Sequence, residues 1–367
     1  MFAVRVVSTL QDFDTLAKRW NGLLGATASD NVFLTWEWLY TWAKHYLGGN
    51  RLWIVLVYKG EQLVGIAPFY IRNMMDGLVK VREMRFLGTE EVCSSYLDFI
   101  VHERHKKAAL HRIYRHLHEE AEGLWDVLTM SEIPAESSSI DFWDGFIQET
   151  GRVMEVAGTT GCPVIDLPTR LEDFLASLSG NDRYNLQRKR KCLEQAGQVA
   201  YERASSSADV EKAMELLVRL HQMRWEQKGA GGVFRSQRYL MFHTEIAQVF
   251  AEKGWVQLDF LRLNGEPIAG IYGYGYNGRY SFYLPGFNPT IVPKASPGML
   301  LLFHCIEEAI HEGYQEFDLL QGATGYKMAW ANGLRRSLTL RYYNKHLRAA
   351  AVKLLESGRA VVKVLVR

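Results

Sequence analysis

The chain has 367 residues, which is enough for about two domains of ordinary size. Hydrophobic residues make up 48% and charged residues 23%, so most of the chain can bury a core and is not disordered. The formal net charge of +2 excludes a simple polyanion-binding protein on charge alone.

Hydrophobic periodicity over residues 1–160 predicts a mixture of helices and strands. Helices are expected through Phe13–Leu23 and over Trp36–Tyr46, Glu103–Glu122 and Glu136–Thr150. Strands are expected at Val4–Val7, Leu52–Tyr58, Gln62–Ile71, Val79–Leu87, Tyr96–Val101, Val127–Met130 and Val153–Val156.

The second part of the chain alternates in the same way. Helices are expected at Leu171–Gly180, Arg183–Gln195, Ala208–Lys228, Gln237–Lys253, Pro297–Glu312 and His346–Ser357. Strands are expected at Pro163–Leu167, Val199–Glu202, Val256–Leu263, Pro267–Tyr276, Arg279–Leu284, Glu316–Leu319 and Leu338–Tyr343.

A repeat connects the two parts. The segment Gly60–Ile66 matches Gly265–Ile271 at an offset of 205 residues, and Gly123–Asp126 resembles Gly313–Asp318 in the same order. Each copy has a strand–turn–strand followed by a long helix, a glycine and a strand that opens on an aromatic residue and aspartate. This pattern favours two tandem α+β domains, although glycine–glutamate hairpins are also common without duplication.

Charge differs between the two parts. Residues 1–160 carry a net charge of −5 and the remainder a net charge of +7, so the second part tolerates an anionic ligand better. An alternative is chance asymmetry between two domains.

No pattern in the sequence indicates a metal site or a disulfide framework. Cys93, Cys162, Cys192 and Cys305 form no CxxC pair, and we expect them to be reduced and structural. A signal-peptide pattern and an apolar run of about 20 residues are both lacking, which predicts a soluble cytoplasmic protein. The basic, apolar tail at 347–366 is expected to dock as an amphipathic helix, or alternatively to contact a membrane surface.

The segment Pro293–Met299 lies between a predicted strand and a predicted helix. Ser296 suits a helix N-cap, Pro297 suits the first helical position, and Gly298 leaves the first turn without a side chain. The free N–H groups could face a pyrophosphate, and Lys294 could add a positive charge. The alternative is a well-capped core helix.

Polar residues follow the end of the predicted strand Glu316–Leu319. The chain breaks at Gly322 and then presents Tyr326 and Lys327, which could protonate or orient a reacting group, or bind an anion. Alternatively, Tyr326 and Trp330 pack one helical turn onto the core and Lys327 is a surface charge.

The helix Ala208–Lys228 ends on His221, Arg224 and Trp225. His221 could act as a base and Arg224 could bind a carboxylate or phosphate, whereas a lone histidine on a helix is more often structural. A basic helix at 183–191 could bind CoA phosphates, nucleic acid or an acidic polymer, or could simply be solvated.

The ordered set of these motifs resembles the GNAT-fold acyltransferases of the CelD type, which are bacterial proteins associated with cellulose and exopolysaccharide biosynthesis. They are related to the Fem-type peptidyltransferases, which also pair two GNAT-like domains. The resemblance rests on the run Ser296-Pro297-Gly298, an apolar helix, Gly313, Phe317-Asp318, Gly322, Tyr326-Lys327 and Trp330. It covers nearly the whole chain and is clearest over residues 170–345.

The resemblance implies an α/β (α+β) fold of two tandem GNAT-like domains, with mixed sheets flanked by helices. We expect an N-terminal domain at 1–160, a C-terminal acyltransferase domain at 161–345 and a helical tail at 346–367. The implied activity is an N-acyltransferase that uses acetyl-CoA or another acyl-CoA as co-substrate and requires no metal. The implied acceptor is an amine, such as an amino sugar or a precursor of a cell-surface polysaccharide.

The resemblance also implies roles for the candidate residues. In that fold the donor lies between two parallel strands, with its pyrophosphate at the start of the following helix. The roles are catalytic for Tyr326, Lys327 and His221, donor-binding for Lys294, Ser296, Pro297 and Gly298, and substrate-binding for Arg224, Trp225 and Asp318.

One departure from the family keeps two alternatives open. The usual glycine signature of that fold, Q/R-x-x-G-x-G/A, is absent from this sequence. An aminoacyl-tRNA donor, as in Fem-type relatives, is the first alternative, although the single basic helix makes nucleic-acid binding the weaker expectation. The second is a non-catalytic scaffold in polysaccharide biosynthesis or export.

Overall fold

The computed structural model describes residues 1–76, 79–149, 154–204, 206–345, 349, 350 and 353. Its contacts form two compact units, one of Met1–Thr160 with Arg336–Arg367 and one of Gly161–Arg335. The expected domain boundaries stay a prediction, and the helical tail expected at 346–367 lies almost wholly outside the described residues. Among the described residues, no helix combines the length and apolarity needed to cross a membrane.

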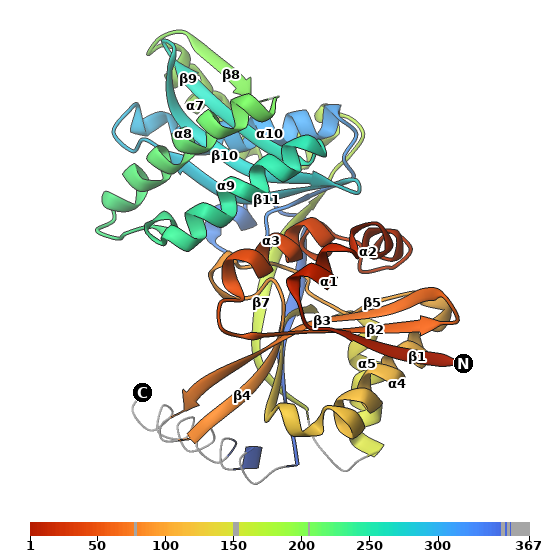
Figure 1. Cartoon of the computed structure of the whole chain (residues 1–367). Helices are drawn as coiled ribbons and strands as arrows, with labels where there is room; N and C mark the ends of the chain where they lie inside the picture. The colour runs from red at the N-terminus through yellow and green to blue at the C-terminus, as the bar shows by residue number, and fades with distance from the viewer. Residues whose placement is uncertain (77–78, 150–153, 205, 346–348, 351–352, 354–367) are drawn as a thin grey trace, which may run out of the picture. The chain divides into compact units, whose positions relative to one another are not determined.

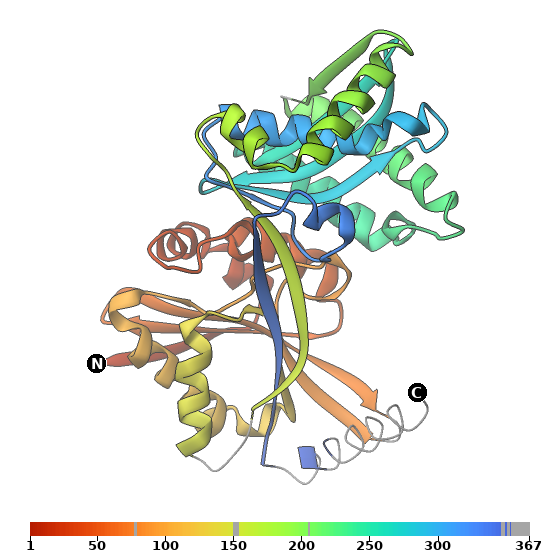
Figure 2. The ribbon, with the colours of Figure 1, turned by 180° about the vertical axis from the view of Figure 1, so that it is seen from behind.

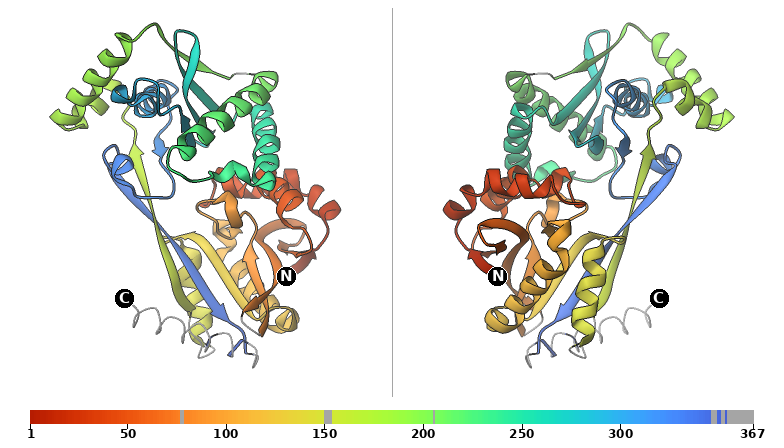
Figure 3. Two further views of the ribbon diagram at one scale, coloured as in Figure 1. Left: turned by 90° about the vertical axis from the view of Figure 1, so that its left-hand side faces the viewer. Right: turned by 90° about the vertical axis from the view of Figure 1, so that its right-hand side faces the viewer.

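Unit 1 is a mixed sheet with helices on both faces, in the strand order β1-β2-β3-β4-β6-β13. Its first three helices lie on one face, and α4 and α5 lie on the other (Figure 1, Figure 3). The strands are β1 Phe2–Val7, β2 Arg51–Lys59, β3 Gln62–Asp76, β4 Val79–Phe86, β5 Ile100–Val101, β6 Val127–Pro134 and β13 Gly333–Tyr343. The helices are α1 Leu10–Asp14, α2 Ala17–Leu24, α3 Trp36–Tyr46, α4 Lys106–Arg115 and α5 Ser138–Glu149.

Unit 2 has the same architecture, in the order β8-β9-β10-β11-β12-β7. Helices α8 and α9 cover one face of the sheet, and α7 and α10 pack together on the other (Figure 2). The strands are β7 Met154–Asp166, β8 Val199–Arg203, β9 Val256–Leu263, β10 Glu266–Tyr276, β11 Arg279–Phe287 and β12 Glu316–Asp318. The helices are α6 Leu171–Ser177, α7 Gly180–Glu194, α8 Ser207–Glu226, α9 Gln237–Glu252, α10 Pro297–His311 and α11 Gly325–Met328.

The two strand orders correspond position by position. In each unit the fourth and fifth strands, β4 with β6 and β11 with β12, are parallel and are separated in sequence by a long helix. The sixth strand is exchanged between the repeats. Strand β7 follows β6 in sequence but pairs with β12, whereas β13 follows β12 and pairs with β6.

Two expected helices are interrupted for local reasons. The Thr15 hydroxyl donates to the carbonyl of Asp12 at 2.8 Å, and the helix expected through Phe13–Leu23 divides into α1 and α2 there. The helix expected at Glu103–Glu122 is regular only over α4. Beyond α4 the Ala121 N–H donates a hydrogen bond to the carbonyl of His116, five residues back. The Trp125 indole donates a hydrogen bond to the carbonyl of Leu117. The two strands expected around residue 160 form the single strand β7.

A glycine sets the distance between α8 and β11. A Cβ atom built on Gly286 would lie 2.6 Å from the backbone nitrogen of His221 and 2.9 Å from the carbonyl carbon of Leu220. The backbones of helix and strand therefore touch, and no larger residue fits between them. This contact fixes the end of α8 beside the second half of β11.

We expect Gly286→Ala to lower the free energy of unfolding by about 1–3 kcal/mol, because the added methyl group forces α8 away from the sheet. Urea unfolding followed by circular dichroism measures the change. The control is Gly180→Ala at the start of α7, where a Cβ meets nothing within 4 Å. An equal loss of stability in both variants would contradict the close approach as the cause.

Candidate functional site

The parallel strands of unit 2 separate after a short contact. Strands β11 and β12 pair only from Arg279 opposite Glu316 to Ser281 opposite Asp318. Beyond that point β11 continues to Phe287, while the Leu319 N–H turns away to the carbonyl of Pro163 at 2.9 Å. A bulge opposite Tyr272 and Gly273 adds to the bend of β11. The sheet therefore opens at this place.

A cavity of about 510 Å³ lies beside the second half of β11 and the start of α10. Most of its wall is apolar, and its polar groups come from the end of α8, the loop after β11, the start of α10 and α11. Its lining residues are Arg224, Gln227, Phe282, Pro285, Phe287, Asn288, Pro289, Pro293, Ser296, Pro297, Gly298, Met299, Leu302 and Tyr326. A few polar groups in an apolar hollow are typical of a small-molecule site.

The start of α10 is shaped to approach a ligand closely. Ser296 has a left-handed backbone, with φ of 50°, and its side chain does not cap the helix. Instead its hydroxyl accepts a hydrogen bond from the Lys189 ammonium of α7. A Cβ on Gly298 would lie 3.0 Å from the Phe287 ring, so a glycine keeps this turn open. An uncapped helix start beside a cation favours an anion.

Arg224, in the last turn of α8, supplies a second positive charge. Its guanidinium donates to the Pro285 carbonyl at 3.3 Å and lies 5.1 Å from the centre of the Phe287 ring. Its Nε atom is buried without a hydrogen-bond partner, and no carboxylate pairs with Arg224 in the part of the chain that the structure describes. Burial lowers the pKa of Arg224, but arginine stays charged at neutral pH. A half-buried cation in a cavity wall that pairs with no carboxylate among the described residues is suited to bind an anion.

His221 lies one turn before Arg224 and is buried. Its Nε2 atom accepts a hydrogen bond of 2.8 Å from the Trp225 indole, so the neutral ring carries its proton on Nδ1. Burial, followed by the nearby charge of Arg224, lowers the pKa of His221 to about 4. Its basic nitrogen is engaged and it does not line the cavity, so the catalytic role expected for His221 stays a prediction.

Tyr326 and Lys327 lie on the short helix α11. Tyr326 lines the cavity and is 44% exposed, and partial burial raises the pKa of its phenol. The Lys327 ammonium donates to the carbonyls of Leu319 at 2.7 Å and Gln321 at 2.6 Å. Burial lowers the pKa of Lys327 to about 8, against the opposing effects of Cys162 and Asp318. The ammonium thus holds the segment that follows β12.

The structure brings together about half of the residues that the sequence singled out. Arg224, Ser296, Pro297, Gly298 and Tyr326 share one cavity. The other five, His221, Trp225, Lys294, Asp318 and Lys327, lie outside its lining.

Each of the residues outside the lining has a different environment. Lys294 is exposed in the turn before α10, and Trp225 holds His221. Asp318 is buried, accepts the Leu320 N–H at 2.8 Å and pairs with Arg335 at 3.4 Å, so its contacts are structural. The donor-binding role of Lys294 and the substrate-binding roles of Trp225 and Asp318 stay predictions, and none of the three lines the cavity.

Several site residues carried no signal that sequence reasoning could use. The sequence gives Phe282 and Phe287 no feature that points to a ligand site. They line the cavity because β11 and β12 separate. Lys189 belonged to the basic helix already noted, but its contact with Ser296 joins positions 107 residues apart.

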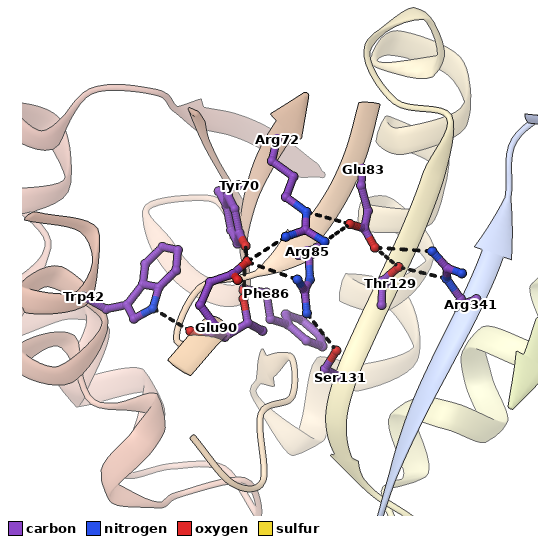
Figure 4. A network of polar contacts seen from close by, with 11 residues as sticks. Trp42, Tyr70, Arg72, Glu83, Arg85, Phe86, Glu90, Thr129, Ser131 and Arg341 are labelled. Atoms are coloured by element: carbon purple, nitrogen blue, oxygen red, sulfur yellow. Dashed lines mark hydrogen bonds and ion pairs between the residues drawn. The ribbon is translucent and has the colours of Figure 1, made fainter. Parts of the chain in front are cut away.

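The corresponding place in unit 1 is filled by ion pairs (Figure 4). Strand β4 pairs with β6 up to Arg85, whose guanidinium meets Glu90 at 3.1 Å. Arg72 joins Glu90 at 3.0 Å to the buried Glu83 at 2.7 Å. Burial opposes ionisation of Glu83, but Arg85, Thr129 and Arg72 together hold its pKa below the usual value.

The charges of this network in unit 1 largely neutralise one another. Arg341 of β13 adds a further contact to Glu83 at 3.6 Å. An anionic ligand would have to break these pairs, so we assign the candidate site to unit 2.

Comparison with known proteins agrees with this assignment. A family model described as an acetyltransferase (GNAT) domain matches residues 180–328, which run from the start of α7 to the end of α11. No protein among the curated sequences matches the chain.

Solved structures match over nearly the whole chain. The crystal structure of FemX has a TM-score of 0.64 at 11% identity and covers 96% of this chain and 100% of its own. A conserved protein of unknown function from Bacteroides thetaiotaomicron has a TM-score of 0.53 at 14% identity, covering 93% and 99%. The C-terminal domain of a candidate lysylphosphatidylglycerol synthetase from Agrobacterium fabrum has a TM-score of 0.51 at 11% identity, covering 95% and 97%. The fold is therefore the mixed α/β GNAT fold, and most of unit 2 is similar to the acetyltransferase (GNAT) domain model.

Proposed function

We propose that the chain is an acyl-CoA-dependent N-acyltransferase that acts on an amine acceptor in the cytoplasm. The observation that carries this proposal is the unpaired guanidinium of Arg224 in the wall of an apolar cavity that ends at an uncapped helix start. Acyl-CoA has the matching chemistry, since a pyrophosphate is attached to a long, mostly apolar arm. The match of unit 2 to acetyltransferase (GNAT) domains supports the same donor class.

The residues of the cavity fit the two ends of such a donor. The N–H group of Gly298, together with Arg224 and Lys189, would bind the pyrophosphate. The apolar wall that includes Phe282 would cover the pantetheine arm. No metal is required, because protein cations and the helix start supply the positive charge.

In the proposed reaction the acceptor amine loses a proton and attacks the thioester carbonyl, and the enzyme's main contribution is alignment. Tyr326 would give its proton to the leaving thiolate, a role suited to a phenol whose raised pKa keeps it protonated. Lys327 has three ammonium protons and uses two of them on carbonyls, so the third is left for the oxyanion.

The acceptor is proposed on the resemblance to CelD-type proteins. Those relatives are associated with cellulose and exopolysaccharide biosynthesis, so an amino sugar or another precursor of a cell-surface polysaccharide is the acceptor class we expect. The acyl group is most simply acetyl. Glucosamine is therefore the probe acceptor for the first assays.

One observation favours a second candidate function. The similarity to FemX extends over 96% of the chain, and Fem-type peptidyltransferases take an aminoacyl-tRNA as donor. A chain that binds neither donor would instead be a scaffold. Isothermal titration with CoA and acetyl-CoA tests the first function, an electrophoretic shift with aminoacyl-tRNA tests the second, and absence of binding to all three supports the scaffold.

We expect Arg224→Gln to raise the Kd for acetyl-CoA about 10–100-fold, because one charge-assisted contact to phosphate is lost. The Tm of the ligand-free protein should stay unchanged or rise, since the substitution removes a half-buried charge that has no carboxylate partner among the described residues. Titration calorimetry and thermal unfolding measure the two effects. Arg219→Gln, an exposed position on the same helix, is the matched control. A Kd for Arg224→Gln equal to that of the control would refute the role of Arg224.

We also expect kcat/KM to fall as the pH rises through about 8, because Lys327 loses its proton above its lowered pKa. CoA release with acetyl-CoA and glucosamine gives the profile. Lys327→Arg keeps the charge and should move this fall to higher pH, whereas Lys327→Met should lower kcat/KM about 100-fold at pH 7. Identical alkaline limbs in the wild type and Lys327→Arg would exclude Lys327 as the titrating group.

A further inference from the structure

The carboxylate of Glu90 in unit 1 is held by three donors that converge on one of its oxygens (Figure 4). The Tyr70 phenol donates to Oε1 at 2.7 Å, Arg72 donates to it at 3.0 Å and Arg85 at 3.1 Å. The second oxygen, Oε2, has no hydrogen bond or ion pair with any residue that the structure describes. We call Tyr70, Arg72 and Arg85 the anion cradle.

Two donors of the anion cradle are held in place by groups other than Glu90. Arg72 pairs with the buried Glu83 through Nε and Nη2, both at 2.7 Å, which leaves its Nη1 for the cradle. The Tyr70 side chain is buried and packs against the Trp42 ring of α3, with the ring centres 4.9 Å apart. Donors fixed in this way keep their positions when the bound carboxylate leaves.

Arg85 is the least satisfied donor of the cradle. Its side chain is only 15% exposed, and its Nε atom is buried without a hydrogen-bond partner. Its Nη2 atom reaches the Ser131 hydroxyl at 3.5 Å, a long contact. Among the residues that the structure describes, Glu90 is the carboxylate that pairs directly with Arg85. Without Glu90 this guanidinium would attract another anion.

Glu90 reaches the cradle from a strained turn. Its backbone is left-handed, with φ of 70°, and Cys93 and Tyr96 follow with φ of 46° and 58°. Residues with a side chain adopt this conformation rarely, so it persists only where surrounding contacts impose it. Glu90 is also exposed, whereas Glu83 is buried. Of the two carboxylates in this network, Glu90 is therefore the one that a ligand can replace.

We propose that the anion cradle of unit 1 binds the carboxylate group of a small-molecule ligand, and that Glu90 occupies the cradle until such a ligand displaces it. A carboxylate is the matching chemical class, because the three donors already hold a carboxylate oxygen. A monocarboxylate also has the charge of the side chain that it replaces. The inference concerns unit 1 and does not depend on the donor proposed for unit 2.

Acetate is the probe for the emptied cradle. Glu90→Ala should bind acetate about 10-fold more tightly than the wild type, because the internal competitor is gone. The rise of Tm with acetate, at an ionic strength held constant with sodium chloride, gives the apparent Kd. Glu90→Gln keeps an oxygen for the donors but loses the charge, so its Kd should lie between the two.

The matched control is Glu119→Ala, also in unit 1. It removes an exposed carboxylate that accepts two hydrogen bonds from Arg115, at 2.7 and 2.6 Å. This variant loses the same charge and an arginine contact, but it leaves the cradle filled by Glu90. Its response to acetate should equal that of the wild type.

The donors and the ligand class are tested in the Glu90→Ala background. Tyr70→Phe removes one donor and should weaken acetate about 5–10-fold. Tyr58→Phe removes a phenol whose oxygen has no hydrogen-bond partner, and it should leave acetate binding unchanged. Inorganic phosphate should bind more weakly than acetate, because its further oxygens find no donor in the cradle.

Displacement of Glu90 in the wild type has its own readout. The Cys93 N–H donates to the Glu90 carbonyl at 3.3 Å, so movement of Glu90 disturbs the backbone at Cys93. Acetate should therefore speed the labelling of Cys93 by iodoacetamide, followed by mass spectrometry of its peptide, whereas sodium chloride should not. In Glu90→Ala the labelling rate should be independent of acetate.

Each outcome decides one part of the proposal. Equal acetate affinities of Glu90→Ala and Glu119→Ala would overturn the cradle, and phosphate binding as tight as acetate would overturn the carboxylate class. Acetate binding to Glu90→Ala with no effect on Cys93 labelling in the wild type would make Glu90 a permanent partner and overturn displacement. Faster labelling in the wild type, with acetate binding that Tyr70→Phe weakens, supports the proposal. If Glu90→Ala does not fold, Glu90→Gln serves for the same comparisons.

Discussion

The separation of β11 from β12 is the constraint on which the candidate site depends. Three parallel residue pairs hold the strands together. Beyond Ser281 the two strands no longer pair, so this edge of β11 is open. A sheet cannot stay closed where one strand turns toward β7 and the other bends at a bulge. The apolar side chains of β11, the start of α10 and the end of α8 all meet at this opening. The glycine contact at residue 286 fixes how near α8 comes.

The two units differ in how the charges beside the separating parallel strands are compensated. In unit 1, Glu83 and Glu90 pair with arginines from neighbouring strands, so the opened sheet is neutralised by the protein itself. In unit 2, no carboxylate among the residues that the structure describes pairs with Arg224. Burying an unpaired cation lowers stability, and such a group persists where a ligand completes its contacts. The two repeats therefore differ at this place: in unit 1 the protein's own ion pairs neutralise the charges, and in unit 2 the charge of Arg224 is available to a ligand.

Much of the fold followed from periodicity, because most helices and strands have a clear apolar face. Strand β9 and helix α3 have the expected bounds, and the strand–helix–strand repeat predicted the shared topology of the units. The breaks in the helices were missed because each depends on a side chain that competes for a backbone group, as Thr15 and Trp125 do.

The site was predictable only in part, for a similar reason. The helix start at 296–298 has a local signature, and its neighbour Tyr326 follows a strand end. The contact of Lys189 with Ser296 and the apolar walls of β11 depend on tertiary packing. His221 is instructive, because its partner Trp225 is four residues away and therefore faces it on any helix. That spacing engages the basic Nε2 atom of His221, which is then not free to take a proton.

The exchange of β7 and β13 has a consequence for biosynthesis. Strand β6 ends at Pro134, yet its partner β13 begins at Gly333, with all of α6 to α11 made in between. At ribosomal rates of about 5–20 residues per second, roughly 10–40 s pass before the missing strand emerges. Throughout that time β6 is an unpaired edge, the kind of surface on which nascent chains aggregate. Unit 2 receives its β7 strand first and can close earlier, so the N-terminal repeat is completed last.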